Sequence, residues 1–106
     1  MKLEGKKVLV VGAGKSGIAA SELLLDKKIE TVLYDGNKDL DVEKLYEKAP
    51  KLKGMPVLLG ELTDEQLRAF DVAVLSPGVP TDLPVVERMR AQNVCIWGEI
   101  ELAYSF

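Results

Sequence analysis

Three glycines in the spacing G-x-G-x-x-G, Gly12, Gly14 and Gly17, follow an apolar run in the stretch VLVVGAGKSG. This spacing suits a phosphate: the first glycine permits a tight turn, the second lets the backbone approach a pyrophosphate, and the third lets a helix pack against a strand. A helix N-terminus favours an anion, to which Lys15 adds a cation and Ser16 a hydroxyl donor or a helix cap. The motif predicts a phosphate site, although a tight turn without a ligand would also use glycine's backbone freedom.

Asp35 is the next candidate, because it ends the apolar segment ETVLYD eighteen positions after Gly17. In dinucleotide-binding folds an acid near this position accepts hydrogen bonds from a ribose. Gly36 and Asn37 follow it and leave room for a base or a sugar against the backbone. A turn started by Asp-Gly is the competing interpretation, and the cofactor domain of an NAD enzyme would suit these residues equally well.

A third group, Ser76, Pro77 and Gly78, follows the apolar segment DVAVLS. Ligands of open parallel sheets bind beyond the carboxyl ends of the strands, where the strand order reverses. We therefore expect this group, the glycine turn and residues 35–37 to face one crevice of nucleotide size. An ordinary turn would also explain Ser-Pro-Gly.

The elements that must position these residues alternate along the chain. Apolar, β-branched runs predict strands at 6–12, 30–35, 56–60, 71–76 and 94–98. Helices are predicted at 16–28, around 42–46 with an end before Pro50, at 63–70 with a capping box of Thr63 and Gln66, at 84–93 after Thr81 or Asp82 as cap, and from 99 onward. The fold class predicted is α/β, a Rossmann-like open parallel sheet of about five strands with helices on both faces.

Composition limits the function. The 106 residues, 47% hydrophobic with a formal net charge of −3, predict a single domain over 1–106 and argue against a nucleic-acid partner. With one cysteine, Cys95, and no histidine, a disulfide, a cysteine-based zinc site and histidine catalysis are excluded. Glu99 and Glu101 suit the first turn of a helix rather than catalysis. We predict no catalytic and no metal-binding residues here, and a cytoplasmic location, since neither a signal sequence nor an apolar run of membrane length is evident.

Four segments in order, VLVVGAGKSGIAA, VLYD, VAVLSPGVP and VCIWGEIELA, resemble the N-terminal domain of the Mur ligases. The resemblance covers essentially the whole chain and is closest to the members that add D-glutamate. GKSG, SPG and GEIEL together are far more specific than the glycine motif alone. Other interpretations are an NAD(H)-binding Rossmann domain of a dehydrogenase, a nucleotide-sensing regulatory module, and a degenerate domain that serves as an oligomerisation scaffold.

The resemblance implies a UDP-binding domain, followed in such ligases by a central ATPase domain and a C-terminal domain. The full enzyme uses ATP and magnesium to convert the carboxylate of UDP-N-acetylmuramoyl-L-alanine into an acyl phosphate, which the amine of D-glutamate attacks in peptidoglycan biosynthesis. The residues implied to bind the UDP moiety are Gly12, Gly14, Lys15, Ser16 and Gly17 at the diphosphate, Asp35, Gly36 and Asn37 at the uridine, and Ser76, Pro77 and Gly78 opposite.

Two departures from the family pattern matter. The sequence ends at Phe106, before the Gly-Thr-Asn-Gly-Lys-type loop that binds ATP in these ligases. The apolar end suggests a piece of a longer protein, although a terminal helix packed on its own domain explains it too; we expect the piece to be inactive without its central domain. Asn37 stands near the place where some relatives have an arginine, so this chain departs from the family pattern at the residues implied to contact the uracil.

Overall fold

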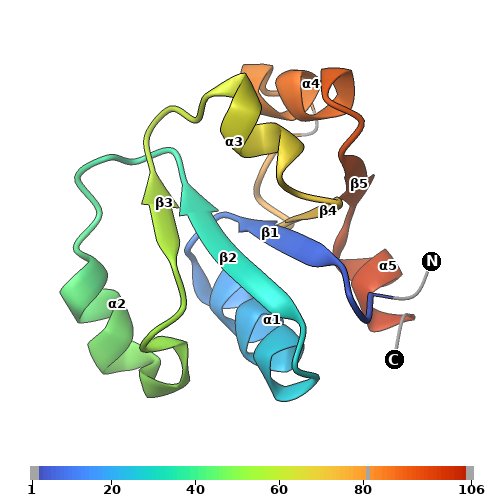
Figure 1. Cartoon of the computed structure of the whole chain (residues 1–106). Helices are drawn as coiled ribbons and strands as arrows, with labels where there is room; N and C mark the ends of the chain where they lie inside the picture. Colours follow the sequence, from blue (N-terminus) through green and yellow to red (C-terminus); the bar gives the residue numbers. More distant parts are fainter. Residues whose placement is uncertain (1–2, 81, 105–106) are drawn as a thin grey trace.

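The computed structural model describes residues 3–80 and 82–104 and contains five strands, as expected (Figure 1). The strands are β1 (Lys7–Val11), β2 (Glu30–Asp35), β3 (Val57–Leu59), β4 (Val72–Leu75) and β5 (Cys95–Trp97). The helices are α1 (Lys15–Asp26), α2 (Val42–Lys48), the 3₁₀-helix η1 (Pro50–Leu52), α3 (Asp64–Arg68), α4 (Pro84–Ala91) and α5 (Glu99–Ala103). The alternation of strands and helices is confirmed.

The sheet has the order β3-β2-β1-β4-β5, and every pair is parallel. In β1, Val10 lies opposite Leu33 of β2 on one side and opposite Val74 of β4 on the other. The chain moves outward from β1 to β3, then crosses to β4 on the other side, so the strand order reverses between β1 and β4. A crevice at the carboxyl ends of these two strands is where such sheets bind ligands.

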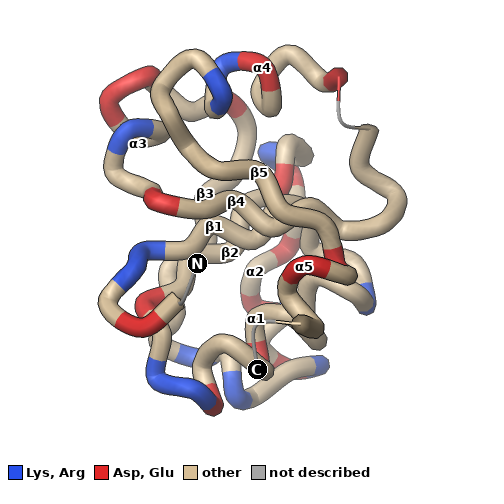
Figure 2. Tube along the Cα trace, turned by 90° about the vertical axis from the view of Figure 1, so that its right-hand side faces the viewer, with Lys and Arg blue, Asp and Glu red and all other residues tan. Residues whose placement is uncertain are grey.

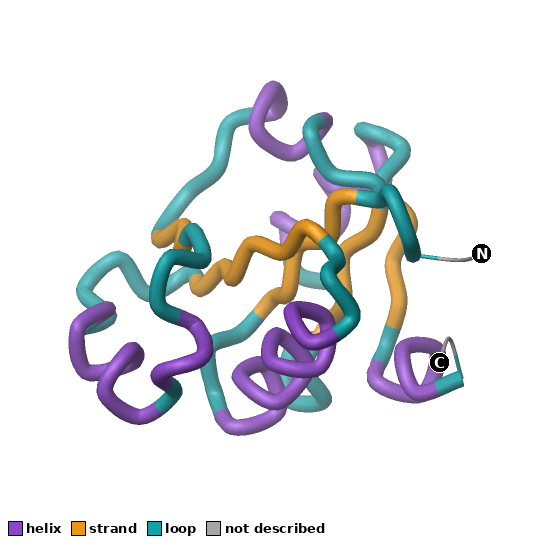
Figure 3. Tube along the Cα trace, turned by 60° about the horizontal axis from the view of Figure 1, so that its bottom comes forward, coloured by secondary structure: helices purple, strands orange, loops and turns teal. Residues whose placement is uncertain are grey.

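Helices cover both faces of the sheet (Figure 3). Val8 and Val10 of β1 belong to a core cluster with α1, α2 and α5, whereas Leu9 and Val11 belong to a second cluster with α3 and α4. Successive residues of a strand point to opposite faces, and all four of these side chains are buried because helices cover both faces. Trp97 of β5 joins the first cluster and is a packing residue. The Rossmann-like α/β class is confirmed.

Helix boundaries show where local rules held. The capping box of α3 is present: the Thr63 hydroxyl accepts a bond from the Gln66 N–H, and the Gln66 side chain accepts one from the Thr63 N–H. Helix α2 ends before Pro50 as expected. Asp82 is not the cap of α4, because Leu83 occupies that position and Pro84 begins the helix. A proline there presets the helical φ and has no N–H that needs a cap.

The remaining expectations concern the surface and the chain end. Lysine, arginine and the acidic residues lie interspersed along helices and loops (Figure 2), with no continuous basic strip in that view. Among the described residues, no helix has the length and apolar character needed to cross a membrane. Helix α5 buries Leu102 and leaves Ile100 70% exposed, and Tyr104, directly after the helix, is 87% exposed. Thr81 and Phe106 lie outside the described residues.

Candidate phosphate-binding site

The glycine turn connects β1 to α1 at the carboxyl edge of the sheet. Gly12 has a φ of +103°, a left-handed conformation that glycine adopts without the steric cost other residues incur. A Cβ atom on Gly12 would lie 3.0 Å from the Oγ atom of Ser76 and 3.3 Å from Val79. Glycine at this position is therefore required both by the backbone conformation and by the closeness of the loop after β4.

Gly17 and Gly14 differ sharply in their surroundings. A Cβ atom on Gly17 would lie 1.7 Å from the carbonyl oxygen of Gly12, so the first turn of α1 packs directly on the preceding turn. A Cβ atom on Gly14 would meet no protein atom within 4 Å, and Gly14 has an ordinary φ of −79°. The backbone at Gly14 is thus open on the side where a ligand could approach.

Helix α1 presents an uncompensated positive end. Its N-cap, Gly14, has no side chain to accept the free N–H groups of the first turn, and that turn contains no acidic residue. Each of the other four described α-helices has at least one acidic residue in its first turn. Lys15 and Ser16 are exposed beside this end. Ser16 is the second helical residue, so the expectation that it caps the helix is wrong.

Asp35 connects the glycine turn to the end of β2. One carboxylate oxygen accepts a hydrogen bond from the Ala13 N–H at 2.9 Å, and the other accepts one from the Asn37 N–H at 2.9 Å. The Gly12 N–H also donates to the carbonyl of Tyr34, at 2.7 Å. Asp35 thus forms the expected turn, and a carboxylate has further lone pairs beyond these two hydrogen bonds.

Tyr34 lies beside Asp35 and holds β2 against the loop after β3. Its hydroxyl donates to the carbonyl of Gly60. Burial, and secondarily the negative charge of Asp35, raises the pKa of the Tyr34 phenol above its ordinary value. A phenol is protonated at neutral pH even at its ordinary pKa, and this shift acts in the same direction, so the hydroxyl remains the donor to Gly60.

The loop after β4 closes the other side of the crevice. The Ser76 hydroxyl donates to the carbonyl of Gly12 at 3.4 Å, and the Ser76 N–H donates to the carbonyl of Val11 at 3.1 Å. The Val79 N–H donates back to the Ser76 carbonyl at 2.9 Å, which closes a turn over Pro77 and Gly78, both exposed. The structure therefore brings the glycine turn next to residues 35–37 on one side and residues 76–78 on the other.

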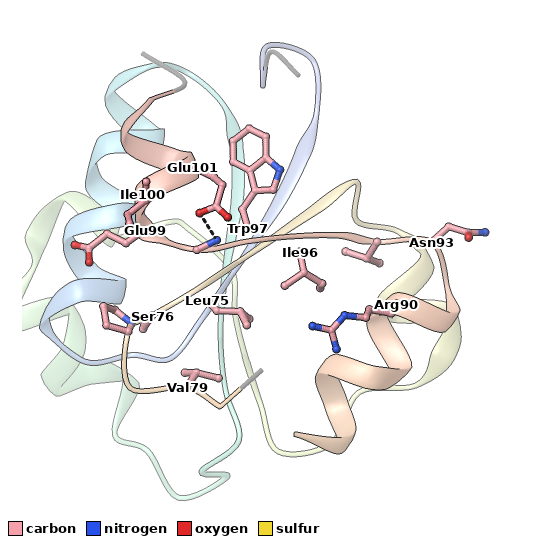
Figure 4. Close-up of a pocket in the computed structure, with 13 residues that line it drawn as sticks. Leu75, Ser76, Val79, Arg90, Asn93, Ile96, Trp97, Glu99, Ile100 and Glu101 are labelled. Carbon is pink, nitrogen blue, oxygen red and sulfur yellow. Dashed lines mark hydrogen bonds between the residues drawn. The ribbon is translucent and has the colours of Figure 1, made fainter. Parts of the chain in front are cut away.

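Among the described residues, a smaller and a larger cavity adjoin this edge, and neither is lined by Gly12, Gly14 or Gly17. The smaller, of about 190 Å³, lies between α1 and α5 and is lined in part by Ser16, Ser76 and Pro77. The larger, of about 800 Å³, extends along the edge strand β5 (Figure 4). It is lined by Leu75, Ser76, Pro77, Val79, Arg90, Asn93, Val94, Ile96, Trp97, Gly98, Glu99, Ile100 and Glu101.

The wall formed by β5 and α5 was not among the predicted binding residues. The available signal was Gly98, a glycine that follows a strand at the same carboxyl edge as Gly12 and Ser76. The Glu101 carboxylate accepts a hydrogen bond from the Gly98 N–H at 3.1 Å (Figure 4), so this acid caps its own helix. The Arg90 guanidinium pairs with Glu87. The N-terminus of α1 has no side-chain cap and no acid in its first turn, whereas α5 carries two acids there, so of these two helix ends that of α1 suits an anion better.

Within 3–80 and 82–104, no group of three or more potential metal ligands comes together.

A parallel sheet with this strand order and a glycine turn that leads into an open helix N-terminus defines a Rossmann-like nucleotide-binding architecture. Residues 6–98 match the family model described as "Mur ligase MurD-like, N-terminal domain". The chain belongs to this family. The resemblance to the Mur ligases is confirmed.

Curated relatives support the same assignment. A UDP-N-acetylmuramoylalanine–D-glutamate ligase of Lachnoclostridium phytofermentans is 49% identical over 106 residues, which are 100% of this chain and 23% of that protein. The ligase of the same name from Lachnospira eligens is 42% identical with the same coverage. The chain thus spans 23% of the length of these relatives.

Solved structures share the fold at low identity. A pseudomurein peptide ligase type C from Methanothermus fervidus superimposes with a TM-score of 0.72 at 18% identity, over 95% of this chain and 20% of that one. A 3-hydroxyacyl-CoA dehydrogenase from Archaeoglobus fulgidus gives a TM-score of 0.63 at 21% identity, over 95% and 38%. These similarities show the fold alone, because ligases and dehydrogenases both use it.

Proposed function

We propose that this chain is the UDP-binding N-terminal domain of a UDP-N-acetylmuramoylalanine–D-glutamate ligase. The whole protein would add D-glutamate to UDP-N-acetylmuramoyl-L-alanine in the cytoplasm during cell-wall synthesis. Residues 1–106 would form one domain, with a central ATPase domain and a C-terminal domain in the remaining part of the protein. Family membership, and relatives that are 42% and 49% identical over the whole chain, support this proposal.

The open N-terminus of α1 is the observation that carries the proposal. A diphosphate bound beside Gly14 would accept hydrogen bonds from the first N–H groups of α1 and would meet the positive end of the helix dipole. The exposed Lys15 would add a mobile cation, and the Ser16 hydroxyl a further donor. Gly12 and Gly17 would serve this site by letting the turn and the helix pack closely.

The two neighbouring segments would complete the pocket. Residues 35–37, from Asp35 to Asn37, would lie along the uridine, and residues 76–78, from Ser76 to Gly78, would close the opposite side. This chain's contribution to the reaction would be to bind and orient the substrate. The sequence has no phosphate loop of the G-x-x-x-x-G-K-[ST] type, so ATP and magnesium would be held by other parts of the whole protein.

The alternative, an NAD(H)-binding domain, gains from the dehydrogenase neighbours only a shared fold. Titration of the chain with UDP and with NADH, followed by amide chemical shifts, separates the two. We expect UDP to shift the amide signals of Lys15, Ser16 and Asp35, with weak affinity because the rest of the substrate's contacts are missing. Shifts with NADH and none with UDP would contradict the proposal.

Lys15→Ala is expected to weaken UDP binding by about three- to tenfold, because one charge-assisted phosphate contact contributes about 1 kcal/mol at an exposed site. The effect should shrink at high salt, since exposed charges are screened. Lys44→Ala in the exposed face of α2 is the matched control and should leave the dissociation constant unchanged. Equal effects of the two variants would mean that Lys15 acts only through net charge.

A further inference from the structure

The hydrogen bonds of Asp35 bear on how the proposed site is built. Its half-buried carboxylate uses one oxygen for the Ala13 N–H, 22 positions away in the chain, and the other for the Asn37 N–H. Both donors are backbone groups, and both lie in the segments that flank the crevice. Asp35 thus joins the glycine turn to the loop after β2 through a single side chain.

The hydrogen bond from the Ala13 N–H to Asp35 lies in the middle of the glycine turn. Ala13 lies between Gly12, whose φ of +103° begins the turn, and Gly14, the N-cap of α1. The Gly12 N–H is bound to the carbonyl of Tyr34, so two successive N–H groups of the turn are held by the end of β2. Without the Asp35 carboxylate, the peptide of Ala13 would lose its partner one residue before the helix starts.

We propose that Asp35 is a positioning residue for the diphosphate: it holds the glycine turn in the conformation that aims the first N–H groups of α1 at the ligand. This inference rests on the proposed function and adds to it that the Asp35 carboxylate serves binding of one part of the ligand only. The diphosphate depends on Asp35 through Ala13, and the uridine does not depend on the carboxylate.

The direction in which Asp35→Asn changes the affinities for pyrophosphate and uridine distinguishes a positioning role from a charge effect and from direct binding of the ribose. A carboxylate near a diphosphate repels it, so a mere charge effect would make an Asp35→Asn variant bind pyrophosphate more tightly. A carboxylate that accepted bonds from the ribose would, when changed, weaken uridine binding and spare pyrophosphate. A positioning role predicts weaker pyrophosphate binding and unchanged uridine binding.

The experiment titrates the chain with inorganic pyrophosphate, uridine and UDP, followed by amide chemical shifts. For Asp35→Asn we expect pyrophosphate and UDP to bind about tenfold more weakly, as loss of a hydrogen bond to a charged acceptor implies. Uridine should bind within about twofold of the unmodified chain, and amide exchange at Ala13 should accelerate by a similar factor of about tenfold. A fold-wide loss of stability would not separate the two ligands in this way.

Asp39→Asn is the matched control, since it removes the same charge from an exposed position in the same loop. It should leave the affinities for all three ligands within about twofold, because screening weakens exposed charges. If Asp35→Asn does not fold, the unmodified chain decides: uridine and 2′,3′-dideoxyuridine should bind within about twofold of each other, because the Asp35 carboxylate accepts no hydrogen bond from the ribose hydroxyls. A preference for uridine of about tenfold or more overturns the inference.

The outcomes separate the inference from the function on which it rests. If the unmodified chain binds UDP and pyrophosphate while Asp35→Asn binds pyrophosphate equally or more tightly, only the positioning role fails. If the variant loses uridine binding and keeps pyrophosphate, Asp35 is a ribose ligand and the inference is wrong. If the unmodified chain binds neither UDP nor pyrophosphate, the proposed function and the inference fail together.

Discussion

Gly17→Ala is expected to abolish UDP binding and to lower the free energy of unfolding by about 3 kcal/mol or more. The added Cβ would lie 1.7 Å from the carbonyl oxygen of Gly12 and 2.9 Å from its carbon, and both are backbone atoms that no side-chain rotation can move away. The turn would have to shift away from α1. This shift would also break the hydrogen bond from the Ser76 hydroxyl to the Gly12 carbonyl. Urea unfolding followed by fluorescence of the buried Trp97 measures the effect.

Gly14→Ala is the matched control for this variant, because it adds the same methyl group three positions earlier where no protein atom lies within 4 Å. Its free energy of unfolding should change by no more than about 1 kcal/mol, the difference between a glycine and an alanine at an N-cap position. A Gly17→Ala variant as stable as Gly14→Ala would show that the helix does not pack on the turn as the structure has it.

Gly14→Val is expected to abolish UDP binding while the domain still folds. At Gly14 the φ of −79° is open to any residue and the space around the Cβ is empty, so the free energy of unfolding should stay within about 1 kcal/mol. The branched side chain would occupy the space beside the first N–H groups of α1, which we assign to the diphosphate. Titration with UDP, beside urea unfolding of the same sample, tests both statements.

The Gly14→Val result also tests the location of the site. Normal UDP binding by a folded Gly14→Val chain would mean that the ligand lies elsewhere, and the cavity along β5 would then be the place to look. Loss of folding would instead mean that the space around Gly14 is less open than the structure indicates. The two glycines of one motif are thus expected to fail for different reasons: Gly17 through the fold, and Gly14 through the ligand.

Local rules predicted the elements well because their causes are local. Thr63 and Gln66 form their capping box from residues three positions apart, and Pro50 stops α2 through its own ring. Where two local signals competed, the prediction failed: Asp82 is a good cap by type, yet Pro84 starts α4 with Leu83 as its cap. Of the two roles predicted for Ser16, that of a helix cap is wrong, since α1 begins at Lys15 with Gly14 as its cap.

The order of motifs along the chain determined the fold class, the family and the three segments that meet at one edge of the sheet. Strand periodicity and glycine spacing are properties of residues close together in the chain, so they can be recognised from the sequence alone. Only the tertiary structure decided what the polar groups at that edge do: Asp35 binds the N–H of Ala13, Ser76 donates to Gly12, and a cavity opens along β5 rather than over the glycines. The physical reason is that these contacts join residues far apart in the chain. Asp35 and Ala13 are 22 positions apart and Ser76 and Gly12 are 64 positions apart, so no local sequence pattern predicts that they meet.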